Sequence, residues 1–183
     1  MIWTLPKKVE FGGRVYGLNT DYRDILEIIG YLNDDMPEFL RWQVALALFY
    51  KEPVADADQG AAMDFLARFI AGGETAEDTA GVRLMDWQQD AAAIISDINR
   101  VAGREIREMP YLHWWTFLSW FHAIGDGQLS ALVQIRDKRR RGQKLTEAEQ
   151  EFYRTNRKRV ELVKHYTGEE IAQQERLKKL LDG

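Results

Sequence analysis

The segment that decides the fold is YLHWWTFLSWFHAI, residues 111–124. Pro110 precedes this segment and two glycines, Gly125 and Gly127, follow it, so the sequence predicts one bounded helix. Apolar side chains fall on more than one face of that helix, and they include three of the six tryptophans: Trp114, Trp115 and Trp120. A helix that is apolar nearly all round is buried between layers or inside an oligomer. We therefore predict a central core helix, with a partner groove floored by aromatic side chains as the alternative.

The composition limits the class of protein. With 183 residues and 21.3 kDa, the chain is long enough for one domain with a substantial core. It has no cysteine, which excludes disulfides, thiolate nucleophiles and cysteine-ligated metals. A net charge of −4 argues against a general nucleic-acid-coating protein. The sequence contains no secretory hydrophobic region and no apolar run of the ~18 residues that a membrane-spanning helix needs, so we expect a cytosolic protein without a membrane partner.

The pattern along the chain predicts mostly helices. Two short β-prone runs flank Gly12-Gly13 within residues 7–18, which predicts a tight hairpin. Such a hairpin is marginal alone, so it must pack on the helices or pair with an edge of another chain. Helical patterns follow at residues 22–33, 35–50, 61–71, 82–101, 111–124, 129–135, 146–163 and 167–182. The predicted fold class is mainly α: a multi-helix bundle with a short N-terminal β-hairpin, forming a single domain over residues 1–183.

The two C-terminal helical segments share a start signal. Thr146 and Glu149 have the spacing of a capping box, and Thr167 and Glu170 repeat it. The apolar stripe over residues 167–182 is narrow. We therefore expect this last helix to lie at the periphery, docked lightly or waiting for a partner.

Catalytic patterns are weak. His113 and His122 lie nine positions apart, which places them on opposite sides of an ideal helix. Asp86, Asp90 and Asp97 share one face of the helix predicted over residues 82–101, where a divalent cation could bind, although carboxylates on a solvated face are commonplace. The chain has no phosphate-binding loop, dinucleotide-binding glycine pattern or nucleophile elbow. We expect no enzyme and no cofactor, with a small metal-dependent enzyme using Asp86, Asp90 and a histidine as the alternative.

Two segments are dense in basic residues, at positions 136–141 and 154–159. They are the one feature that favours nucleic acid. Asp137 interrupts the first segment, and Glu147, Glu149 and Glu151 lie between the two. A solvated or subunit-pairing face is the preferred interpretation.

Several stretches of the chain resemble those of a known family. They are GRVYGLNTDYR at residues 13–23, MDWQQDAAAIISDI at 85–98, HWWTF at 113–117, IRDK at 135–138 and KLTEAEQEFYR at 144–154. In this order they resemble the bacteriophage gene-product-fifteen family, over nearly all of the chain up to about residue 162. The helix predicted at residues 167–182 departs from the family pattern.

The resemblance implies a place in the tail-morphogenesis module of long-tailed phages. It implies a tail assembly chaperone in the host bacterial cytoplasm that binds the tape-measure protein, helps recruit tail-tube subunits and is absent from the finished particle. It supplies no catalytic residues. We also expect a homo-oligomer. The alternatives are a nucleic-acid-binding phage regulator and a structural subunit of the phage tail or head–tail joint.

These considerations predict three groups of partner-binding residues. Apolar side chains near the aromatic segment would support the partner surface, an arginine run would attract acidic segments, and the last helix would cover the groove or bind a neighbour. The residues are Trp114, Phe117 and Phe121; Arg139, Arg140 and Arg141; and Leu177, Leu180 and Leu181.

Overall fold

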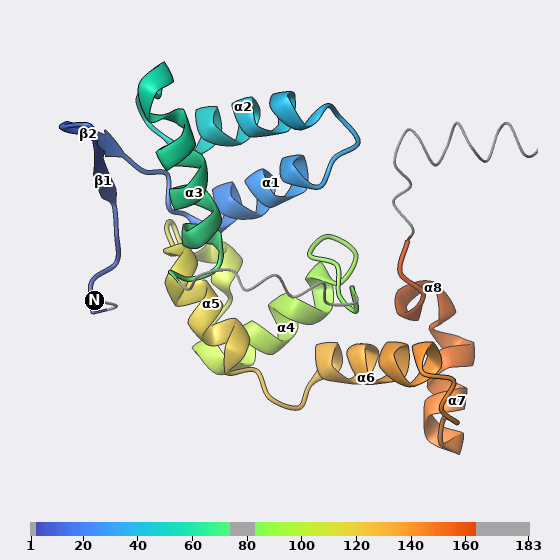
Figure 1. Cartoon of the computed structure of the whole chain (residues 1–183). Helices are drawn as coiled ribbons and strands as arrows, with labels where there is room; N and C mark the ends of the chain where they lie inside the picture. The colour runs from blue at the N-terminus through green and yellow to red at the C-terminus, as the bar shows by residue number, and fades with distance from the viewer. Residues whose placement is uncertain (1–2, 74–82, 164–183) are drawn as a thin grey trace, which may run out of the picture.

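A computed structural model describes residues 3–73 and 83–163. This part of the chain holds eight α-helices and one two-stranded antiparallel sheet, which confirms the predicted fold class (Figure 1). The hairpin lies at one end of the molecule beside α3, and α6 to α8 lie at the opposite end. None of the described helices combines the length and apolarity needed to span a bilayer.

The elements follow the chain in three groups. The hairpin is β1 (Lys8–Phe11) and β2 (Arg14–Gly17), and the first helical group is α1 (Tyr22–Leu32), α2 (Glu38–Phe49), the 3₁₀ turn η1 (Asp56–Asp58) and α3 (Gln59–Ile70). The central group is α4 (Ala91–Ala102), the 3₁₀ turn η2 (Ile106–Glu108) and α5 (Trp114–His122). The last group is α6 (Gln128–Arg140), α7 (Glu147–Thr155) and α8 (Arg157–Val160).

The hairpin forms where the sequence predicts it. Gly12 and Gly13 have φ angles of +52° and +76°, a backbone conformation that residues with a Cβ rarely adopt. Phe11 and Tyr16 turn inward, and their rings lie 5.9 Å apart. Tyr16 also donates a hydrogen bond from its hydroxyl to Asp58 at 2.7 Å. The hairpin therefore packs on the segment between α2 and α3.

The aromatic helix α5 lies in the core, as predicted. Trp114 and Phe117 are each 1% exposed. Phe117 stacks on Tyr22 of α1 with ring centroids 4.8 Å apart, and the Trp114 indole donates to the Ile70 carbonyl at the end of α3. These contacts join α5 to the first helical group.

The predicted start of this helix, at residue 111, is wrong, because α5 begins at Trp114. Residues 111–113 instead run beside residues 20–22: the Leu112 carbonyl accepts from the Tyr22 N–H, and the Trp114 N–H donates to Thr20. His113 then caps the helix, since its Nδ1 accepts from the Trp115 N–H at 3.0 Å. This pairing with residues 20–22 uses backbone N–H and C=O groups that an additional helical turn before Trp114 would need.

His113 predicts a pH dependence of stability. Burial lowers the pKa of His113 below its ordinary value of 6.5. The folded protein therefore binds fewer protons than the unfolded chain just below pH 6.5, so the contribution of His113 is complete above that pH and falls as the pH decreases. Protonation would also remove the Nδ1 acceptor that caps α5.

Urea unfolding at several pH values between about pH 7.5 and pH 5.5 measures this effect. We expect the free energy of unfolding of the wild type to decrease with falling pH more steeply than that of His113→Asn, which retains a capping group but does not titrate. Equal slopes for the two proteins would contradict the assignment.

Two other predicted helices are shorter than expected. The helix predicted over residues 82–101 begins only at Ala91, because the Asp86 carboxylate accepts from the N–H groups of Gln88 and Gln89 and holds a turn; residue 82 lies outside the described residues. The helix predicted over residues 146–163 ends at Thr155, and Asn156 separates α7 from the single turn α8.

The capping box at Thr146 and Glu149 is confirmed. The helix predicted at 167–182, its capping box and the single-domain prediction stay predictions, since residues 164–183 lie outside the described residues.

Candidate functional site

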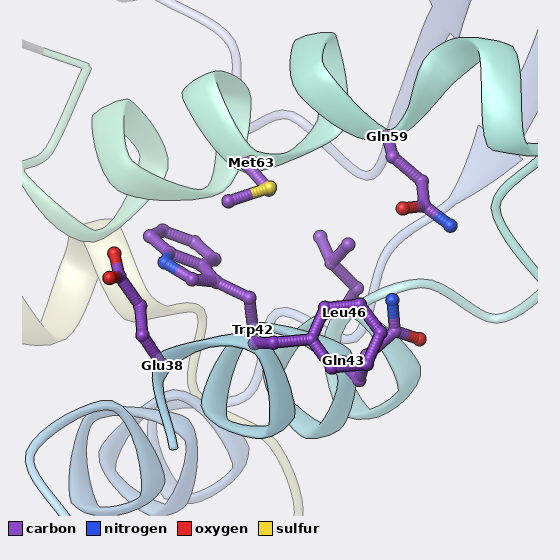
Figure 2. A pocket seen from close by; sticks show the side chains of 7 residues that line it. Glu38, Trp42, Gln43, Leu46, Gln59 and Met63 are labelled. Atoms are coloured by element: carbon purple, nitrogen blue, oxygen red, sulfur yellow. The ribbon is translucent and has the colours of Figure 1, made fainter.

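An apolar groove lies between α2 and α3 and is the candidate partner site. It encloses about 290 Å³ and is lined by Glu38, Phe39, Trp42, Gln43, Leu46, Gln59 and Met63. Figure 2 shows Trp42 and Leu46 directed from α2 toward α3, which contributes Met63 and Gln59 from the other side. A groove of this size accepts a few apolar side chains of a partner.

The first turn of α2 exposes apolar surface beside this groove. Phe39 is 68% exposed and the adjacent Leu40 is 48% exposed. Pro37 precedes the helix in an extended conformation, and the turn that follows it stays exposed among the described residues. Exposed apolar side chains that adjoin an apolar groove mark an interaction surface more often than a single exposed side chain does.

Polar and acidic groups form the rim. Glu38 lies at one end of the groove, in the first turn of α2, and Asp34 is exposed in the loop before it. Gln43 and Gln59 supply neutral amides along the sides. An amphipathic helix with an apolar stripe and flanking basic groups matches this combination of charge and shape.

The sequence contains a signal for this site. Apolar residues occur around most of the circumference of α2, including Phe39, Trp42, Val44, Leu46 and Phe49. The structure buries Phe49 and Leu46 and leaves Phe39 exposed. A helix that is apolar over most of its circumference but leaves a large apolar side chain exposed has surface available for a partner.

The aromatic residues predicted to bind a partner lie mainly in the core. Trp114 and Phe117 present no side-chain surface, so in this conformation they support the fold. Phe121 is half-buried, with its ring 4.9 Å from that of Trp87. Phe39 and Leu40 of α2 are more exposed than any of these three side chains of α5, whose predicted role in partner binding stays a prediction. Leu177, Leu180 and Leu181 lie outside the described residues.

The predicted arginine run is exposed but engaged within the chain. Arg139 lies 4.0 Å above the Tyr153 ring and pairs with Glu161. Arg140 and Arg141 both pair with Asp137, at 2.7 and 2.8 Å. Hydrogen bonding to Arg140, and then to Arg141, lowers the pKa of Asp137. These pairings reduce the positive potential that the run offers to an acidic segment or to a phosphate backbone.

The second basic segment is paired in the same way. Arg154 lies 2.7 Å from Glu151, and Arg157 lies 3.1 Å from Glu161. Asp137 and Glu151, two of the acidic residues that interrupt or separate the basic runs in the sequence, are thus partners of those runs in the structure. Exposed pairs of this kind contribute little to stability, but they neutralise part of the basic surface.

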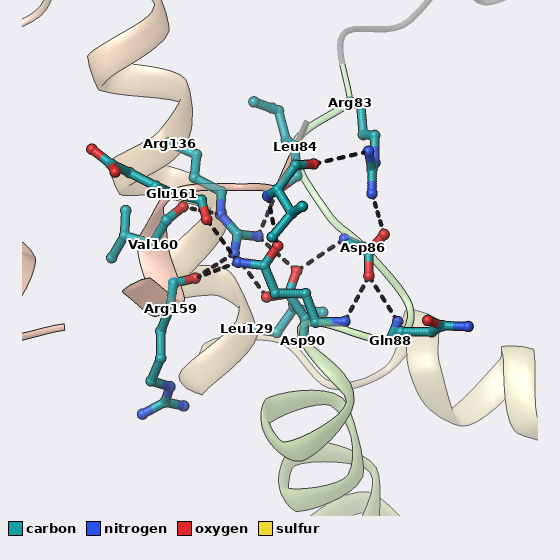
Figure 3. A network of polar contacts seen from close by, with 12 residues as sticks. Arg83, Leu84, Asp86, Gln88, Asp90, Leu129, Arg136, Arg159, Val160 and Glu161 are labelled. Atoms are coloured by element: carbon teal, nitrogen blue, oxygen red, sulfur yellow. Dashed lines mark hydrogen bonds and ion pairs between the residues drawn. The ribbon is translucent and has the colours of Figure 1, made fainter. Parts of the chain in front are cut away.

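One arginine of the first basic run is buried and has a structural role. Arg136 of α6 is bidentate to Asp90, with nitrogen–oxygen distances of 2.6 and 2.8 Å. It also donates to the carbonyl groups of Leu84, Arg159 and Val160 (Figure 3). We call Asp90 and Arg136 the clasp. It fixes α8 and the segment before α4 against α6.

The three carboxylates considered for a metal each have other partners. Asp90 belongs to the clasp, and Asp86 bonds Arg83 and two backbone N–H groups. Asp97 accepts from the N–H groups of Gln128 and Leu129 and so caps α6 from the side of α4. No group of three or more His, Cys, Asp or Glu side chains that could hold a metal occurs in the described part of the chain.

A family model described as Bacteriophage Gp15 protein matches residues 1–162. The chain belongs to this family. The match confirms the resemblance inferred from the sequence, and it identifies the chain as a phage protein. The matched range contains the residues of both the groove and the clasp, and it ends before residues 167–182. Comparisons with curated proteins and with solved structures found no match.

Proposed function

We propose that this phage protein is a tail assembly chaperone that binds the tape-measure protein through the α2–α3 groove and helps recruit tail-tube subunits. The observation that carries the proposal is the exposed apolar surface of Phe39 and Leu40 beside the groove, in a chain of a phage family. The proposed site of action is the host bacterial cytoplasm, and the action is binding without catalysis.

The physical argument starts from the partner. A tape-measure protein is a long helical chain whose apolar faces would aggregate before the tail tube encloses them. A chaperone for such a chain has to accept amphipathic helices loosely and release them. An open groove lined by methionine and tryptophan suits this task, because Met63 adapts its shape to different apolar side chains and Trp42 supplies a large apolar surface.

Copurification with the coexpressed tape-measure protein tests the proposal. We expect Phe39→Asp to reduce capture at least tenfold, because a charge replaces an apolar contact of roughly 1.5–3 kcal/mol. The matched control is Val15→Asp, which places the same charge at an exposed apolar position on the hairpin. Circular dichroism should show both variants folded, since surface substitutions usually change stability by less than about 0.5 kcal/mol.

A second variant separates the groove from the C-terminal segment. Replacement of Leu177, Leu180 and Leu181 by serine should weaken capture if the last segment contributes to binding, and unchanged capture would remove that segment from the binding surface. Equal capture by wild type, Phe39→Asp and Val15→Asp would reject the groove as the site.

Mass spectrometry of finished virions distinguishes a chaperone from a structural subunit of the tail or head–tail joint. A chaperone should be absent from the particle, and stoichiometric presence of this chain in purified virions would favour the structural alternative.

A further inference from the structure

The two outer edges of the hairpin differ. Beyond β2, the Gly17 N–H donates to the Glu52 carboxylate and the Gly17 carbonyl accepts from the Lys51 N–H, so this edge is covered. Beyond β1, Lys8 and Glu10 are exposed. Within residues 3–73 and 83–163, no donor or acceptor reaches the outward backbone groups of Lys8 and Glu10. One edge of this sheet is therefore open.

The register determines which backbone groups point outward on β1. Val9 is opposite Tyr16, and Lys8 is opposite Gly17. The Leu18 N–H donates to the Lys7 carbonyl. In the Lys7–Leu18 and Val9–Tyr16 pairs, the two residues therefore direct their backbone N–H and C=O groups toward each other. Lys8 and Glu10 alternate with these residues, and their N–H and C=O groups point away from β2.

The sequence of the open edge is complementary to itself. In an antiparallel pair of β1 strands centred on Val9, Lys8 of each copy lies opposite Glu10 of the other. This register places the outward N–H and C=O groups of Lys8 and Glu10 in hydrogen-bonded pairs. It also places two Lys–Glu side-chain pairs on the exposed face of the sheet, where opposite charges directly across from each other are stabilising.

We propose that β1 pairs with β1 of a second copy of this chain, antiparallel about a two-fold axis at Val9, to form a four-stranded sheet. An isologous contact of this kind satisfies the open backbone groups of both copies at once. It is independent of the α2–α3 groove, which lies on other elements.

The ends of the edge limit the contact to a short segment. Pro6 has no N–H, and its carbonyl is already bonded to the His113 ring at 3.1 Å. Gly12 begins the turn at the other end. Leu5 and Trp3, which is 91% exposed, precede the strand and would run past the hairpin tip of the second copy, where they add apolar contact.

Charge reversal tests this register. Sedimentation velocity of the full chain over a range of concentrations should show a reversible dimer for the wild type. Lys8→Glu places Glu opposite Glu at both pairs, and Glu10→Lys places Lys opposite Lys, so we expect each variant to weaken dimerisation about tenfold or more. An equimolar mixture of the two variants restores both opposite-charge pairs and should restore the dimer, as should the double variant K8E/E10K.

Two further variants complete the test. Lys8→Pro removes an outward N–H that bonds nothing within the hairpin, and it should abolish the dimer. Lys144→Glu makes the same charge change as Lys8→Glu at an exposed residue of the α6–α7 loop and should leave the dimer unchanged. The proposal is overturned if the wild type is monomeric at every concentration. It is also overturned if the charge-reversed variants dimerise like the wild type, or if mixing them fails to restore the dimer. None of these results bears on capture of the tape-measure protein by Phe39→Asp, so failure of this inference is distinguishable from failure of the proposed function.

Discussion

Replacing Arg136 by alanine is expected to lower the free energy of unfolding by about 3–5 kcal/mol, the range typical of breaking a buried ion pair. The Asp90 and Arg136 side chains are only 1% and 5% exposed. Without the guanidinium, Asp90 keeps a charge with no counter-ion, and the carbonyl groups of Arg159 and Val160 lose a donor. Urea denaturation monitored by circular dichroism measures the change.

Two controls make this result specific. Arg139→Ala removes an exposed arginine from the same helix and should cost less than about 1 kcal/mol. The double variant D90L/R136M removes both charges together and should recover much of the lost stability, because uncharged side chains of similar volume can replace a buried ion pair. If Arg136→Ala and Arg139→Ala destabilise the protein equally, the clasp has no special role.

Further contacts beside the clasp join the segment before α4 to the residues after α8. The side chain of Gln89 donates to the Glu161 carbonyl at 2.7 Å and accepts from the Val163 N–H at 2.9 Å. Together with the Arg136 contacts, these bonds hold the backbone before residue 164 against the start of α4. Loss of the clasp should therefore increase amide hydrogen exchange in α8 more than in α1.

Trp114→Ala is expected to destabilise the fold by about 3–5 kcal/mol, as large-to-small substitutions of buried aromatic residues do. The indole stacks on Phe117 at 5.3 Å, and its N–H bonds Ile70, so the substitution leaves a cavity and an unpaired carbonyl between α5 and α3. Trp3→Ala removes a tryptophan that is 91% exposed and should change stability by less than about 0.5 kcal/mol. Thermal unfolding of both variants measures the difference.

This prediction also distinguishes a partner site on α5 from one at the α2–α3 groove. If α5 carried the partner site, Trp114→Ala would reduce capture of the partner while leaving the fold stable. In the structure described here, Trp114→Ala acts on stability, whereas Phe39→Asp acts on capture. A stable Trp114→Ala protein that fails to bind its partner would contradict this division.

The parts of the fold that could be predicted from the sequence depend on local signals. Gly12-Gly13 specifies the hairpin turn because few other residues adopt positive φ angles. Thr146 and Glu149 specify the start of α7 through reciprocal bonds within one helical turn. The aromatic composition of residues 111–124 was sufficient to predict burial of α5.

The parts that could not be predicted depend on residues far apart in the chain. The start of α5 is set by pairing between Thr20 and Trp114, and the segment before α4 is fixed against α6 by Arg136, 46 positions after Asp90. The groove requires Trp42 and Met63 on adjacent helices, and the exposure of Phe39 depends on how the described elements pack around α2. Sequence periodicity predicts which faces of α2 are apolar. It does not predict which of those faces the rest of the chain covers.

Site-specific photocrosslinking tests most directly the claim that the α2–α3 groove binds the tape-measure protein. A photoreactive phenylalanine derivative would replace Phe39 in one experiment and the exposed hairpin residue Val15 in another, each coexpressed with the tape-measure protein. Mass spectrometry would identify the crosslinked peptides. We expect crosslinks from position 39 to apolar helical segments of the tape-measure protein and none from position 15. Intact complexes without any crosslink from position 39, or with equal crosslinking from both positions, would contradict it.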